Sequence, residues 1–169
     1  IADINDISST LLEKHTINKE DVESVVVAGN TTMTHIFWGL NPAYIREEPY
    51  VPTVNFFPRW RAETAILKAN PRAHVFTLPC VASYVGGDIV AGVLASKMHR
   101  KSEIALFMDI GTNGEIVIGN REWLVTAACS AGPCFEGSGI RHGMRATEGA
   151  VESVNIDPVT FEPALGVIG

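Results

Sequence analysis

The chain has 169 residues, of which 46% are hydrophobic and 19% charged, a balance typical of a globular protein and not of a disordered one. Its 13 basic and 19 acidic side chains give a formal net charge of −6, which argues against general affinity for nucleic acid. No apolar run approaches the roughly 20 residues that span a membrane. No signal peptide precedes the first helical pattern, so we expect a cytoplasmic protein.

The three cysteines, Cys80, Cys129 and Cys134, lie at spacings that match no common zinc or iron–sulfur pattern. Apolar or small residues surround each of them, so we expect buried, free thiols in a reducing compartment. The five histidines are scattered along the chain. We therefore expect no metal site that is built from protein ligands alone.

The start of the chain alternates helical and extended patterns. Apolar side chains recur at helical spacing over residues 3–15, which predicts an amphipathic helix. Residues 22–28 contain three consecutive valines and predict a buried strand of a parallel sheet, and a second helix is predicted over residues 34–40. Asn30 and Thr31 lie in the turn between them. They are candidates for an anion site at the helix N-terminus, and the alternative is that they only cap the helix.

An irregular, proline- and aromatic-rich connection occupies residues 41–62. Arg46, Arg59 and Arg61 interleave with its aromatic side chains, a pattern that can form a platform for nucleotides or nucleic acid. The acidic net charge and the neighbouring pair Glu47-Glu48 favour a packed loop or a partner surface instead.

A short strand is predicted over residues 74–78, and an interior helix over residues 84–95. This helix is dense in glycine and alanine. Because an interior glycine costs about 1 kcal/mol relative to alanine, we expect close packing against it. Asp88 is the only charged residue of the run. It lies either near the helix start, where the helix dipole favours a carboxylate, or in a cleft.

The segment that organises the second half is a hairpin. The apolar run over residues 104–108 predicts a buried strand that ends on Asp109, a turn follows over Gly111, Thr112, Asn113 and Gly114, and a second β-branched run leads away. The glycines let backbone N–H groups approach an anion, and Thr112 adds a hydroxyl. Asp109 can hold a hydrated Mg²⁺ against a phosphate. The alternative is a structural hairpin whose aspartate caps its own turn.

Beyond the hairpin we expect a third antiparallel strand over residues 123–128, then a loop leading into a helix over residues 130–140. Small residues in that loop, including Gly132 and Gly137, allow a backbone or a ligand to come close. A further strand is predicted over residues 150–156, with a turn at Asp157-Pro158.

Six long, ordered stretches together resemble one family, the reductive activators of corrinoid proteins, over nearly the whole chain. These stretches are Val27–His35, Leu78-Pro79, Tyr84–Gly92, Asp109–Glu115, Ala131–Pro133 with Phe135–Gly137, and Gly143–Ala146. Cys134 departs from the family pattern, in which alanine is expected. The resemblance is to the C-terminal domain, an actin-like (ASKHA) ATPase with ribonuclease H-like lobes. It implies an α/β fold with parts of two lobes: residues 1–100 as the second part of the first lobe, and residues 101–169 as the first part of the second lobe.

The resemblance also implies an activity, an ATPase-coupled return of Co(II) corrinoid proteins to Co(I). Nucleotide would bind between the lobes, with Asp109 as catalytic residue and Mg²⁺ ligand, and Asp88 as a second catalytic candidate. The implied partner is a corrinoid protein, with a homodimer as an option and with neither nucleic acid nor a membrane. The candidate nucleotide-binding residues are Gly111, Thr112, Asn113, Gly114, Asn30, Thr31, Gly132 and Gly137.

Both ends of the chain look cut from a longer protein. The family's [2Fe–2S] domain would lie N-terminal to it, since this chain shows no ferredoxin cysteine pattern. The first-lobe Asp-x-Gly-Thr hairpin and the adenosine-contacting glycines are also expected outside it. Because phosphates would be clamped between two hairpins, we expect residues 1–169 alone to hydrolyse ATP poorly.

Two alternatives remain open. A phosphotransferase of the acetate- or sugar-kinase kind uses the same hairpin, and it would need a dedicated base, for which Asp88 is the only candidate. A non-catalytic module that dimerises and docks a partner is the other.

Overall fold

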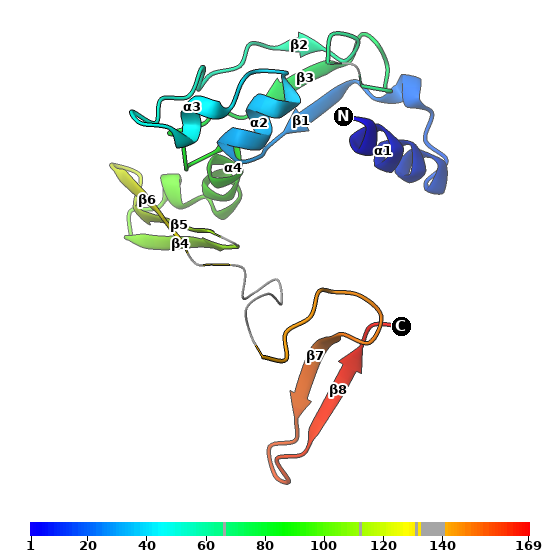
Figure 1. Ribbon diagram of the computed structural model, residues 1–169, viewed down its shortest axis with the longest axis vertical. Coiled ribbons are helices and arrows are strands. Elements are labelled where there is room, and N and C mark those ends of the chain that lie inside the picture. Colours follow the sequence, from blue (N-terminus) through cyan, green and yellow to red (C-terminus); the bar gives the residue numbers. More distant parts are fainter. Residues whose placement is uncertain (66, 112, 131, 133–140) are drawn as a thin grey trace. The chain divides into compact units, whose positions relative to one another are not determined.

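A computed structural model describes residues 1–65, 67–111, 113–130, 132 and 141–169 (Figure 1). The chain divides into two compact units, each described here by itself. The first comprises Ile1–Phe107 with Val117–Thr126, and the second comprises Met108–Ile116 with Ala127–Gly169. Among the described residues, no helix is long and apolar enough to cross a membrane.

The first unit contains a three-stranded sheet in the order β1-β3-β2. Strand β1 (Ser24–Val27) pairs in parallel with β3 (His74–Thr77), and β2 (Trp60–Arg61) pairs with β3 in antiparallel orientation. The parallel pairing that the valine run predicted is therefore confirmed. Helices α1 (Ala2–Lys14), α2 (Thr31–Phe37) and α3 (Ala43–Arg46) and the 3₁₀ turn η1 (Lys19–Asp21) complete this region.

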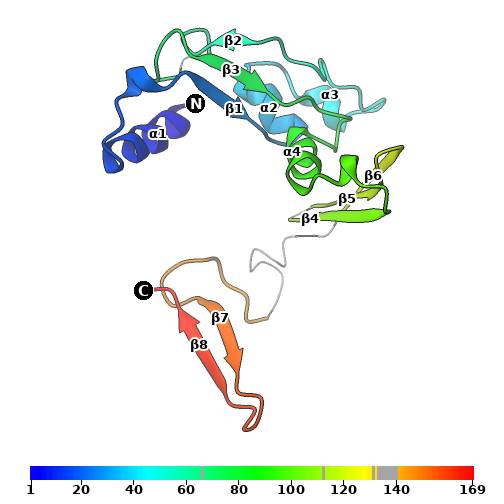
Figure 2. The same ribbon diagram turned by 180° about the vertical axis from the view of Figure 1, so that it is seen from behind.

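The two faces of this sheet differ in burial. Val25, Val27 and Val75 pack with Phe37 of α2 in one core cluster, whereas Val26 and Phe76 point the other way and are 65% and 42% exposed. The expectation of a buried β1 is thus wrong for one face, because the helices of the described residues pack against only one side of the strand. Figure 2 shows the sheet from the side away from α2.

Helix α1 forms where the periodicity predicted it, but its apolar side chains Ile4, Ile7 and Leu11 are 42%, 62% and 52% exposed. Its anchoring contact is polar: the backbone N–H of Lys68 donates to Oδ1 of buried Asn5 at 2.7 Å. The spacing of apolar residues correctly predicted an amphipathic helix. Whether its apolar face is buried depends on what packs against that face.

A second core cluster joins helix α4 (Gly87–Ser96) to the start of the following sheet. Its buried members are Val85, Ile89, Met98 and Val117, with Phe107 packed against them. A Cβ built on Gly92 would lie 2.2 Å from Cζ of Phe107, so the glycine makes room for this ring. The expected close packing against the glycine-rich helix is confirmed.

The remaining elements are the turn η2 (Met98–Arg100), strands β4 (Ala105–Ile110), β5 (Asn113–Gly119) and β6 (Leu124–Ser130), and strands β7 (Val151–Ile156) and β8 (Pro163–Val167). Strands β4, β5 and β6 form a sheet in that order, and their short connections allow only antiparallel neighbours. The three predicted strands are therefore confirmed, but the burial expected of the first is wrong, since Leu106 and Met108 of β4 are 57% and 54% exposed. The helix predicted after residue 130 lies outside the described residues.

Strands β7 and β8 pair in antiparallel orientation from Val151↔Val167 to Ile156↔Pro163. The carboxylate of Asp157 closes their connection by accepting the backbone N–H groups of Val159 and Thr160 at 2.7 and 2.8 Å. The predicted strand over residues 150–156 and the turn at Asp157 are confirmed, because an aspartate that binds the amides after it stabilises a turn.

Candidate functional site

The predicted phosphate-binding hairpin is tighter than the sequence suggested. Strand β4 continues through Asp109 to Ile110 and β5 begins at Asn113, so residues 111 and 112 alone connect them. The expected four-residue turn is wrong: Asn113 and Gly114 belong to β5, and Asp109 lies one residue before the strand end. The backbone N–H of Gly111 donates to the carbonyl oxygen of Asn113 at 2.9 Å. This bond closes a turn that is shorter than the apolar pattern indicated.

The hairpin offers unequal groups to a ligand. Asp109 is exposed, and none of the residues that the structure describes forms a hydrogen bond or ion pair with its side chain. The amide of Gly111 is engaged by Asn113. Gly114 is buried, and its carbonyl oxygen accepts from Sγ of Cys129 at 3.3 Å. The carboxylate is thus the most accessible of these groups, and a phosphate would have to compete for the Gly111 amide.

Of three other candidate residues, the structure describes one. Gly132 adopts a φ of +82°, a conformation that a glycine takes at little cost. Thr112 and Gly137 lie outside the described residues. The roles predicted for all three in nucleotide binding stay predictions.

The turn between β1 and α2 forms a second group of candidates, in the first unit. Oδ1 of Asn30 accepts the backbone N–H of Met33 at 2.8 Å, so Asn30 is the N-cap of α2. The hydroxyl of Thr31 donates to the carbonyl oxygen of Ala82 at 2.7 Å, and Thr31 is only 1% exposed. The structure thus shows that Asn30 caps α2, and whether it also contacts a ligand stays a prediction. A ligand contact by Thr31 would require its hydroxyl to leave Ala82.

The start of α4 packs directly on this turn. A Cβ on Gly86 would come within 2.4 Å of Cα of Asn30, and one on Gly87 within 2.8 Å of the carbonyl oxygen of Leu78. The amide of Asp88 donates to the carbonyl oxygen of Gly29 at 3.3 Å. Asp88 lies in the first turn of α4, where its Oδ1 accepts the amide of Ile89 at 2.9 Å. The helix-start position considered for Asp88 is therefore confirmed.

The structure thus brings Asn30, Thr31 and Asp88 together in the first unit, and places Asp109, Gly111, Asn113 and Gly114 in the second. Sequence reasoning gave no role to His35, which is fully buried and bonds through Nδ1 to the carbonyl oxygen of Thr31 at 2.8 Å. Its place four residues after Thr31 on α2 was the available signal, because residues four apart share a helix face.

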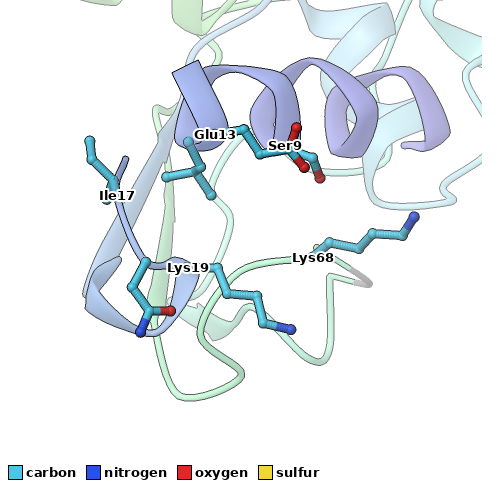
Figure 3. A pocket seen from close by; sticks show the side chains of 7 residues that line it. Ser9, Glu13, Ile17, Lys19 and Lys68 are labelled. Atoms are coloured by element: carbon cyan, nitrogen blue, oxygen red, sulfur yellow. The ribbon is translucent and has the colours of Figure 1, made fainter. Parts of the chain in front are cut away.

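One cavity of the first unit lies away from these candidates. It has a volume of about 400 Å³ and is lined by α1, the start of η1 and Lys68. Figure 3 shows Ser9 and Glu13 on α1, with Lys19 and Lys68 extending from the facing segments. None of the candidate nucleotide-binding residues that the structure describes lines it.

The cysteines differ in accessibility. Cys80 is 3% exposed, as predicted, whereas Cys129 is exposed and Cys134 lies outside the described residues. The expectation for Cys129 is wrong because β6 is the edge of its sheet and most of its residues are exposed. Across the described ranges, no group of three histidine, cysteine, aspartate or glutamate side chains could hold a metal ion.

Comparison with known proteins shows which family the chain resembles. The family model of the RACo middle region matches residues 1–101, and the model of the C-terminal ASKHA domain of RACo matches residues 103–169. The chain belongs to the RACo family. The predicted resemblance and the α/β, actin-like ATPase fold class are thereby confirmed. The lobe boundary predicted between residues 100 and 101 stays a prediction.

Individual relatives agree with the family. The chain is 33% identical over 152 residues to the corrinoid activation enzyme RamQ of Eubacterium limosum, covering 90% of this chain and 25% of that protein. It is 36% identical over 73 residues to the [Co(II) methylated amine-specific corrinoid protein] reductase of Methanosarcina barkeri, covering 43% of this chain and 14% of that protein.

A solved structure of a reductive activator for corrinoid, iron-sulfur protein aligns with a TM-score of 0.84 and 51% identity. The alignment covers 97% of this chain and 26% of that one. The chain therefore spans about a quarter of the length of RamQ and of this reductive activator.

Proposed function

We propose that these residues are part of an ATP-dependent reductive activator that returns Co(II) corrinoid proteins to Co(I). The observation that carries the proposal is the 51% identity over 97% of the chain to a protein named as a reductive activator for corrinoid, iron-sulfur protein. Two further relatives are named for corrinoid activation and corrinoid reduction. A corrinoid protein as partner, a homodimer and a cytoplasmic location belong to the same proposal.

The hairpin is the proposed phosphate site of the second lobe. Its chemistry fits Mg²⁺-nucleotide, since Mg²⁺ is usually bound through one or two carboxylates, the phosphates and water, and Asp109 is an exposed carboxylate. Asp109 would hold the metal or its water, and the backbone of Gly111, Asn113 and Gly114 would border the phosphates. Thr112, Gly132 and Gly137 are proposed as further contacts.

The redox chemistry belongs to the cofactors, a corrinoid on the partner and a [2Fe–2S] cluster on a separate domain of the activator. The proposed contribution of this chain is conformational. Nucleotide that binds one arrangement of the lobes more tightly than another shifts their populations by its difference in affinity. An arrangement that docks the corrinoid protein would thereby favour electron transfer.

The phosphotransferase alternative has less support. It needs a carboxylate that is free to act as a general base, and Oδ1 of Asp88 accepts a backbone amide at the start of α4. No contact of the described residues specifically favours the non-catalytic docking module, and nucleotide binding would distinguish it from the activator.

The test is Asp109→Asn in the full-length protein, with Asp6→Asn on the exposed side of α1 as the matched control. Calorimetry with Mg-ATP and spectroscopic assay of Co(II)-to-Co(I) activation should show both functions lost in the first variant and retained in the second. Loss of several kcal/mol of preorganised charge stabilisation corresponds to about 10²-fold or more in rate. Unchanged binding and activation in Asp109→Asn would overturn the assignment of the phosphate site.

A further inference from the structure

The connection between α3 and β2 contains a strap, residues 50–57, that is fastened at two points to the segment before α4 (Figure 1). At one point the hydroxyl of Ser83 donates to the carbonyl oxygen of Tyr50. At the other point the amide of Cys80 donates to the carbonyl oxygen of Asn55 at 2.9 Å. Ser83 and Cys80 are 7% and 3% exposed. Both donors therefore come from buried residues that underlie the strap.

A third fastening ties the strap to α2. The backbone N–H of Val54 donates to Nε2 of His35 at 3.5 Å, and the ring of Phe57 lies nearly perpendicular to the imidazole, with 6.0 Å between the centroids. Nδ1 of His35 bonds to the carbonyl oxygen of Thr31 at 2.8 Å. Because a carbonyl oxygen only accepts and a backbone N–H only donates, the imidazole is neutral with its proton on Nδ1. Buried His35 therefore bridges the start of α2 and the strap.

The closed strap carries two internal costs. Tyr50 adopts a φ of +60°, a left-handed conformation that costs free energy for a residue with a Cβ. Oδ1 of Asn55 is buried and has no hydrogen-bond partner among the described residues, which is unfavourable because this oxygen has lost its water. Opening would let Tyr50 return to a negative φ and would give Asn55 water. The three fastenings and the two costs therefore oppose each other.

We propose that residues 50–57 open and close as one unit while the parallel strands β1 and β3 stay paired. Segments with exposed side chains and few apolar contacts open at low free energy, and Tyr50 and Phe56 are 49% and 80% exposed. The segment that the strap fastens also accepts the hydroxyl of Thr31, through Ala82. The open strap would therefore leave this hydroxyl less firmly held. Opening needs no nucleotide and does not depend on the site at the second hairpin.

Hydrogen exchange of single amides in the full-length protein measures the opening. The amides of Val54 and Cys80 are bonded across the strap. The amide of Leu78 is bonded to the carbonyl oxygen of Val27 at 2.9 Å, where β1 and β3 end. After correction for intrinsic rates, Val54 and Cys80 should exchange with one common opening constant, and both should exchange faster than Leu78.

A variant at Ser83 tests whether the fastenings act together. Ser83→Ala removes the hydroxyl that bonds to Tyr50, so it should raise the exchange of Val54 and of Cys80 by the same factor, about threefold to tenfold. The exchange of Leu78 should not change. A factor shared by both amides is the signature of one opening unit, because neither amide is bonded to Ser83.

The matched control is Ser96→Ala. The hydroxyl of Ser96 also donates to a backbone carbonyl oxygen, that of Val93 at 3.2 Å, but it lies at the end of α4 and outside the strap. Exchange of Val54 and Cys80 should be the same in this variant as in the unmodified protein. A rise equal to that of Ser83→Ala would contradict the proposed fastening.

Two substitutions at Tyr50 separate backbone strain from the ring contact. Tyr50→Gly and Tyr50→Ala both remove the ring that lies 6.3 Å from that of Tyr84, but only glycine adopts a φ of +60° at little cost. Exchange of Val54 and Cys80 should therefore be slower in the glycine variant than in the alanine variant. This pair leaves Ser83 unchanged, so it tests the strap even if Ser83→Ala fails to fold.

Three results would overturn the proposal. Different opening constants for Val54 and Cys80 would show that no common unit opens. Exchange of both amides as slow as that of Leu78 would show that the strap stays closed until the sheet unfolds, or that another part of the polypeptide holds it down. Equal exchange in Tyr50→Gly and Tyr50→Ala would show that the closed strap stores no backbone strain.

Discussion

The hydroxyl of Thr31 is bonded to the carbonyl oxygen of Ala82, 51 residues later in the sequence, at 2.7 Å. Thr31 begins α2, and Ala82 forms a β-bridge with Val85 immediately before α4. This bond and the contact of Gly86 with Asn30 together join the starts of the two helices. The side chains of Thr31 and Asn30 are therefore already hydrogen-bonded within the protein, and these bonds hold the candidate residues of the first unit in place.

Thr31→Val should lower the free energy of unfolding by about 1–3 kcal/mol, because valine has nearly the same shape and leaves the carbonyl of Ala82 without its partner. Thr31→Ser retains a hydroxyl and should cost less. Urea denaturation followed by circular dichroism measures both. Equal stability of the valine and wild-type proteins would show that water replaces the hydroxyl at no cost.

Gly92→Ala should destabilise the protein although alanine is the better helix former. The propensity gain of about 1 kcal/mol is opposed by a Cβ that would lie 2.2 Å from Cζ of Phe107, and overpacking of this kind costs about 1–3 kcal/mol. Thermal unfolding should show a lower midpoint. Adding Phe107→Leu should recover part of the loss in a double-mutant cycle, and simple additivity of the two changes would contradict this explanation.

Asp157 should make the β7–β8 hairpin sensitive to acid. Hydrogen bonds from the backbone of Thr160 and Val159 lower the pKa of its carboxyl below the ordinary value of 3.8. Because the pKa is depressed in the folded state, the stabilisation is present above the ordinary pKa and is lost as pH falls through the folded value. Amide exchange of residues 151–167 measured against pH should show this loss. Asp157→Asn keeps an acceptor oxygen and should remove the pH dependence.

The cysteines should react with thiol reagents at different rates. In a Cys134→Ala background, Cys129 should be labelled in the native protein, and Cys80, which is 3% exposed, only after denaturant is added. The hydrogen bond from Cys129 to Gly114 is weak because a thiol is a poor donor, so it should slow labelling little. Mass spectrometry of labelled peptides distinguishes the sites. Rapid native labelling of Cys80 would contradict its burial.

Local pattern determined most elements of this protein. Helical spacing placed α1, three valines placed β1, and an asparagine after a strand gave the N-cap of α2. The long motifs around Asn30, Gly86 and Asp109 indicated the RACo family. These inferences succeed because side-chain periodicity, capping and turn chemistry act over a few residues, and a single sequence contains all the information that they need.

Tertiary structure decided what the local pattern left open. Val26 is exposed while its neighbours pack against α2, because within the described ranges a helix covers only one sheet face. The turn after Asp109 is shorter than expected because strands β4 and β5 extend past the apolar runs. Thr31 reaches Ala82, and Arg61 reaches His74, across separations of 51 and 13 residues. Contacts of that kind depend on how the chain returns to itself, and no local spacing in the sequence encodes that return.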